Sequence, residues 1–178
     1  MQRRALILLS TLLCVFPGAA AFDSSAEPFI QRSMEALFDL DFTRSRSEMR
    51  RLIEAQPSNP LGYLGEAGLL WWQASAEFGL FRDTPVLEEL FEEDVDAAIA
   101  AAKPLIDSDD PRAQADGYFA SGMALGLHGQ WEIGRGRFLK AYFDGKKAVK
   151  HLKRCVKLDP DYHDAYLGLG VFDYQAAS

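Results

Sequence analysis

The chain has 178 residues, of which 48% are hydrophobic, and its net charge is −7. The length and apolar content fit one domain that buries a sizeable core. The acidic balance argues against general nucleic-acid binding.

The N-terminus has the pattern of a secretory leader. Arg3 and Arg4 precede an apolar run over Ala5–Phe16, and the small residues that follow offer an Ala-x-Ala cleavage site. The run is shorter than the roughly 20 residues needed to span a bilayer. We therefore interpret 1–21 as a signal peptide and expect 22–178 to be periplasmic or secreted. The mature chain then has 17 basic against 26 acidic residues, a net charge of −9.

After the leader, helical periodicity recurs and no strand-like alternation appears, so the predicted class is all-α. Ser24 and Glu27 have the spacing of a capping box at the first helix. Asp110 before Pro111 is a second predicted cap. The further expected elements, in chain order, are helices at Phe42 to about Ala55 and Pro60 to about Phe78, a loop at Leu80–Thr84, helices at Pro85–Ile106 and Arg112–His128, a turn at Gly129–Trp131, a helix ending near Leu158, and a helix over His163–Ala176.

The most regular part of the sequence is Ala148–Tyr174. Apolar residues at i, i+4 and i+7 mark one helix face, Pro160 ends that helix, and a new helix follows. Cys155 lies on the apolar face. As the one cysteine of the mature chain it has no internal disulfide partner, and we expect it to be a buried small hydrophobe.

Several positions show the same order of residues. An aromatic is followed four residues later by a small residue, and a proline closes the second helix of a pair: Tyr63 with Ala67, Tyr118 with Gly122, Tyr166 with Gly170, and Pro57 and Pro160. This order resembles the tetratricopeptide repeat, a helix-turn-helix of roughly 34 residues. The resemblance covers about two thirds of the mature chain.

The spacing departs from a regular array. Tyr63 to Tyr118 is 55 residues and Tyr118 to Tyr166 is 48, both longer than the roughly 34 of the family. We expect the extra length in 79–97 and 132–147. The predicted architecture is therefore antiparallel helical hairpins stacked as a short irregular solenoid of about seven helices. A non-repeat helical bundle is the alternative.

The resemblance implies a concave groove lined by the first helix of each hairpin, and it implies binding rather than catalysis. Carried over residue by residue, the partner-binding positions are Leu64, Trp71, Trp72, Leu167, Val171 and Tyr174. Adjacent helical residues point about 100° apart, so one of the two tryptophans is expected in the core. The alternative is that both are packing residues.

Charge is segregated along the chain. Ten acids lie between Asp83 and Asp110, and nine bases lie between Arg135 and Lys157. A basic stripe runs along the last long helix: Lys146, Lys150, Lys153 and Lys157. Three interpretations stay open: a solvated helix back, a dock for an acidic partner or an anionic lipid surface, and pairing of the acidic with the basic segment.

Catalytic and metal patterns are weak. The three histidines lack the spacing of a metal pair, and we interpret them as isolated surface or cap residues. We expect no catalytic residue, metal or cofactor. The predicted function is an exported, non-catalytic scaffold that binds a protein or peptide and no nucleic acid, in a bacterial envelope assembly.

The alternative function is the N-terminal helical part of a larger exported enzyme or envelope component. It rests on the helix over His163–Ala176, which has no following partner helix and would leave apolar residues partly open. Either the chain continues beyond this helix, which we favour, or Ala165–Tyr174 itself acts as a cap or docks on another subunit, so that the helix mediates self-association.

Overall fold

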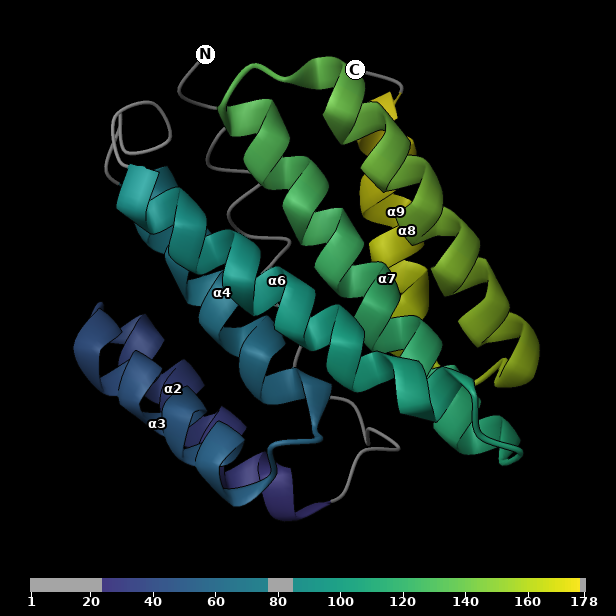
Figure 1. Cartoon of the computed structure of the whole chain (residues 1–178), viewed down its shortest axis with the longest axis horizontal. Helices are drawn as coiled ribbons and strands as arrows, with labels where there is room; N and C mark the ends of the chain where they lie inside the picture. Colours follow the sequence, from purple (N-terminus) through teal and green to yellow (C-terminus); the bar gives the residue numbers. More distant parts are fainter. Residues whose placement is uncertain (1–23, 77–84, 177–178) are drawn as a thin grey trace.

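The computed structural model describes residues 24–76 and 85–176, and within these ranges it contains only helices, turns and loops. The predicted all-α class is confirmed (Figure 1). A short 3-10 turn, Ser24–Ala26, precedes seven α-helices: α2 Glu27–Phe38, α3 Phe42–Ala55, α4 Pro60–Ala76, α6 Pro85–Ile106, α7 Pro111–Gly134, α8 Phe138–Leu158 and α9 His163–Ala176. The interpreted signal peptide and the loop expected at 80–84 lie outside the described residues.

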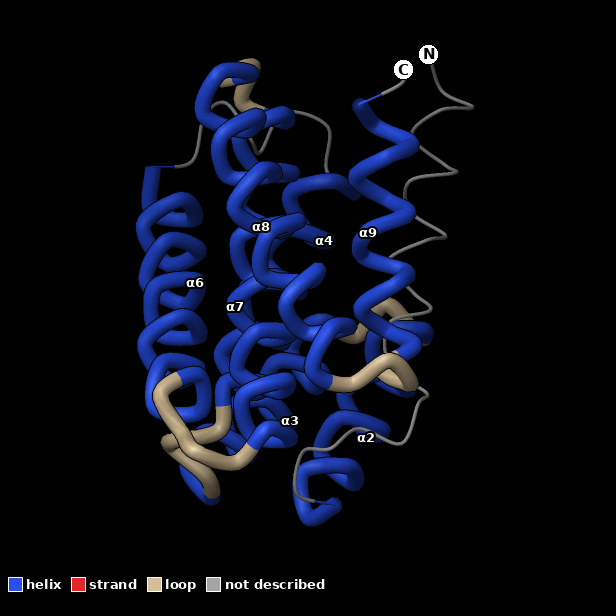
Figure 2. Tube along the Cα trace, turned by 90° about the vertical axis from the view of Figure 1, so that its right-hand side faces the viewer, coloured by secondary structure: helices blue, strands red, loops and turns tan. Residues whose placement is uncertain are grey.

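The helices stack side by side in chain order. Each packs against the next, and α4 also contacts α7, while α7 also contacts α9. Figure 1 shows α2 and α3 at one end, α4 and α6 in the middle, and α7 and α8 at the other end, and Figure 2 shows α9 beside α8. The expected stack of antiparallel hairpins is therefore present in the described residues.

Large apolar side chains hold the stack together. The main core lies between α3, α4, α6 and α7, where Leu52, Leu70, Phe91 and Trp131 are fully buried. A second cluster joins α7, α8 and the connection to α9. Cys155 belongs to this second cluster and is fully buried, as predicted.

Two expected caps have different outcomes. The Asp110 carboxylate accepts a hydrogen bond from the backbone N–H of Arg112, so the predicted cap of α7 is confirmed. The Ser24–Glu27 capping box is wrong. A 3-10 turn runs directly into α2. The N-cap residue of α2 is Ala26, which forms no side-chain capping hydrogen bond.

The turn predicted at Gly129–Trp131 is also wrong. Helix α7 continues to Gly134, and the chain turns at Gly136, whose φ of 76° lies in the left-handed region that favours glycine. Trp131 is fully buried and stacks on Phe91, with ring centroids 4.1 Å apart. Residues 132–147, where the resemblance led us to expect extra length, form the end of α7, the turn and the beginning of α8. Within the described ranges, no helix combines the length and apolar character of a membrane span.

Candidate functional site

An apolar groove of about 310 Å³ runs between the helices that begin successive hairpins. Helices α2, α4, α7 and α9 contribute to its walls, together with the inner face of α8. None of the described residues that line it is charged. Its larger lining side chains include Ile30, Met34, Met49, Leu61, Leu64, Trp72, Met123, Ile133, Phe138, Tyr142, Leu167, Val171 and Phe172.

Glycines of α4 and α7 contribute to the groove lining. On α7, Gly122, Gly126 and Gly129 follow a four-then-three spacing, which places them on one helix face, and all three line the groove. On α4, Gly65 and Gly68 do the same. A Cβ at Gly68 would meet nothing within 4 Å, so this position is open space rather than a tight helix contact.

The structure brings together four of the six partner-binding positions implied by the repeat resemblance. Leu64 and Trp72 on α4 and Leu167 and Val171 on α9 all line the groove. Tyr174 does not belong to the lining, and 57% of its surface is exposed at the end of α9. Four of the predicted residues thus lie on the groove wall, and their role in binding a partner stays a prediction.

The two adjacent tryptophans point in different directions, as their neighbouring positions on a helix require. Trp71 is buried in the main core and does not line the groove, whereas Trp72 is half-buried and does. Their rings meet edge to face, with centroids 6.4 Å apart. Trp71 is thus corrected from a binding candidate to a packing residue that supports Trp72 from behind.

The predicted basic stripe lies on the solvent side of α8. Lys146, Lys150, Lys153 and Lys157 are all exposed, and among the described residues none of the four forms an ion pair. The ammonium of Lys146 lies 5.6 Å from the ring centroid of Tyr142, within cation–π range. The bases that do pair with the acidic segment come from the turn before α8 and from its first residues.

A buried charged cluster, which the sequence did not indicate, joins α6, α7 and α8. His128 is only 7% exposed, so its interpretation as a surface or cap residue is wrong. Its Nδ1 lies 3.0 Å from a carboxylate oxygen of Asp144, and its Nε2 lies 3.0 Å from one of Glu92.

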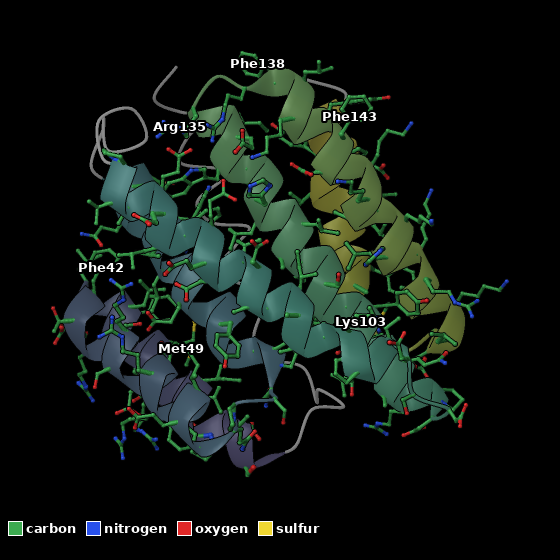
Figure 3. The ribbon with its side chains drawn as sticks, viewed as in Figure 1. Phe42, Met49, Lys103, Arg135, Phe138 and Phe143 are labelled. Atoms are coloured by element: carbon green, nitrogen blue, oxygen red, sulfur yellow. The ribbon has the colours of Figure 1, made fainter. Side chains whose placement is uncertain are left out.

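The same cluster continues to the turn between α7 and α8. Glu132 is fully buried, and the guanidinium of Arg137 donates to both of its carboxylate oxygens. Arg137 and Arg135 both reach Glu88, at 2.6 and 2.9 Å. Figure 3 shows Arg135 at this turn, beside the beginning of α6. The acidic and basic segments therefore do pair with each other within the chain, at Glu88, Arg135 and Arg137.

Burial and ion pairing act in opposite directions on Glu132. Burial raises the pKa of its carboxyl, but hydrogen bonds and charges from Arg137 and Lys140 outweigh it, so the pKa lies below its usual range. Glu132 is therefore an anion held by its cationic neighbours, as expected for a structural ion pair.

Three donor groups in this cluster could face a metal ion. Single ligand atoms of Glu92, His128 and Glu132 lie within 4.8 Å of one another. The ammonium of Lys140, however, lies 3.3 Å from Glu132 Oε1, 3.6 Å from Glu92 Oε1 and 3.5 Å from His128 Nε2. A lysine cation already occupies the position between the donors, so the geometry favours an internal ion network over a metal centre.

Comparison with known proteins adds no family assignment. No family model, curated protein or solved structure matches the chain.

Proposed function

We propose that this chain is an exported, non-catalytic helical-repeat scaffold whose groove binds the apolar face of a helix from a protein partner. The observation that carries the proposal is the uncharged groove of about 310 Å³, which contains four of the positions expected from the tetratricopeptide resemblance. Helix-in-groove recognition places apolar anchors at i, i+3 or i+4, and i+7 into such a surface.

The dimensions support a helical ligand. The groove follows α7 from Gly122 to Ile133, which spans roughly 16 Å, or about three helical turns. Its lining combines aromatic and methionine side chains with the open position at Gly68. Trp72 is the best candidate for an anchor contact because it is large and half-buried in the free protein.

The test is to fill the groove without disturbing the fold. Gly68→Leu places a side chain into open space on the groove wall, and Gly170→Leu is a matched control, since a Cβ there also meets nothing within 4 Å and the residue lies outside the lining. Each protein is used for affinity capture from its own envelope fraction. Wild type and Gly170→Leu are expected to recover the same partner, and Gly68→Leu to lose it.

Trp72→Ala should weaken the same capture by removing contact area while retaining helicity by circular dichroism. If Gly68→Leu and Trp72→Ala both recover the wild-type partners in wild-type amounts, the groove is not the binding surface and the proposal is wrong.

A further inference from the structure

The outward face of α8 has an unusual distribution of charge. Seven basic residues lie within the helix, and every one is exposed: Lys140, Lys146, Lys147, Lys150, Lys153, Arg154 and Lys157. Lys140 and Lys147 reach back to the buried acids Glu132 and Asp144, so the other five supply the charge of the outward face. The one acid of the helix, Asp144, is buried against His128 on the opposite side. The solvent-facing surface of α8 therefore carries cations and no exposed acid.

Large apolar side chains extend this surface at the beginning of the helix. Phe138, Leu139, Tyr142 and Phe143 are each between 53% and 73% exposed. Figure 3 shows Phe138 and Phe143 at the outer edge of the molecule, where α8 begins. The rings of Tyr142 and Phe143 meet edge to face, with centroids 5.7 Å apart.

The apolar and basic parts share one side of the helix. Leu139, Phe143 and the four lysines of the basic stripe follow a spacing of 4, 3, 4, 3 and 4 residues, which keeps them on a single stripe of an α-helix. The stripe is about 27 Å long at 1.5 Å per residue. A flat partner could therefore touch all of it at once.

We propose that this face of α8 docks on the surface of an anionic phospholipid bilayer. The cations alone would suit any acidic partner, but the exposed side chains of Leu139 and Phe143 on the same stripe need an apolar phase directly beside the anionic groups. A bilayer presents both, because aromatic and aliphatic side chains enter the boundary between headgroups and acyl chains while lysines remain at the headgroups. Phe138 and Tyr142 border the groove as well, whereas Leu139, Phe143 and the lysines of the basic stripe lie outside its lining, so the proposal does not depend on what the groove binds.

The test is co-sedimentation of the full chain with phosphatidylcholine vesicles, with and without roughly one third phosphatidylglycerol. Each neutralised lysine is expected to weaken partition onto the anionic vesicles about fivefold, so Lys150→Gln, Lys153→Gln and Lys157→Gln together cost roughly a hundredfold. The same three positions changed to arginine keep the charge and should retain binding. Every variant carries the same residues 1–21, so differences between variants report on α8.

The apolar part of the face is tested with a double variant and a matched control variant. Leu139→Ser combined with Phe143→Ser should weaken binding to the anionic vesicles, whereas Phe38→Ser, which removes a similarly exposed ring on α2, should not. Wild-type partition of the triple glutamine variant would overturn the proposal. It would also fall if the wild-type chain dimerises without lipid in sedimentation velocity and the paired serine variant abolishes the dimer, because the face would then join two copies.

Discussion

Replacement of Asp116 by Asn should stabilise the protein in a strongly pH-dependent way. Asp116 on α7 is 6% exposed, and its carboxylate accepts a hydrogen bond of 3.1 Å from the hydroxyl of Tyr162, in the connection between α8 and α9. Burial raises the pKa of this carboxyl from 3.8 to about 6, although the Tyr162 hydrogen bond lowers it in part. The folded protein therefore ionises Asp116 only at a cost.

The direction in which stability changes with pH follows from the number of protons that each state binds. Between the unfolded pKa near 4 and the folded pKa of about 6, the native state holds more protons than the unfolded state, so wild-type stability from this group falls as the pH rises. One pKa unit corresponds to about 1.4 kcal/mol, so the loss reaches about 3 kcal/mol above pH 6. An Asn at 116 keeps an acceptor oxygen for Tyr162 and never ionises.

The assay is urea unfolding of wild type and Asp116→Asn at a series of pH values. The difference in unfolding free energy should grow by about 1.4 kcal/mol per pH unit between pH 4 and 6 and then stay constant. Tyr162→Phe removes the donor, so it should move the upper end of this window to higher pH. A difference that is the same at pH 4 and pH 7 would refute the reasoning, because it would mean that Asp116 ionises equally in both states.

Three further predictions concern packing. Trp71→Ala should lower the free energy of unfolding by about 3–5 kcal/mol in urea denaturation, whereas Trp72→Ala in the groove wall should cost about 1–2 kcal/mol; equal losses would contradict their assignment. In Gly145→Ala, the new Cβ would lie 2.4 Å from the ring of Phe172, so α9 should become more sensitive to limited proteolysis. The Cys155 thiol, whose pKa burial raises to about 12, should react with a thiol reagent only after unfolding, and reaction in the native protein would show that the second core cluster is open.

Local signals were sufficient to predict the class and most helices. The bounds of α3, α6 and α9 follow from apolar periodicity and from proline and aspartate at helix ends, which act over a few residues. The end of α7 was missed because Gly129 looks like a turn residue. In the structure a Cβ there would lie 3.3 Å from the carbonyl oxygen of Ala141, so this glycine instead allows close approach of α8.

The groove and the charged cluster differ in how far sequence could locate them. The repeat resemblance singled out Leu64 and Trp72, and both line the groove. His128 was missed because its carboxylate partners, Glu92 and Asp144, lie 36 and 16 residues away and belong to other helices. Spacing in the sequence identifies side chains that meet on one helix. Which side chains meet between helices depends on how the helices pack, and spacing does not show that.

The charged cluster and the groove are linked through α8. Asp144 attaches one side of α8 to His128 on α7, and the next residue, Gly145, lines the groove and receives the ring of Phe172 from α9. Adjacent helical residues point about 100° apart, so the ion pairs that fix the rotation of α8 also fix which of its side chains face the groove. The segment between Trp131 and Ala148 thus carries Glu132, Arg137, Lys140 and Asp144, and it brings this buried cluster to the part of α8 that lines the groove.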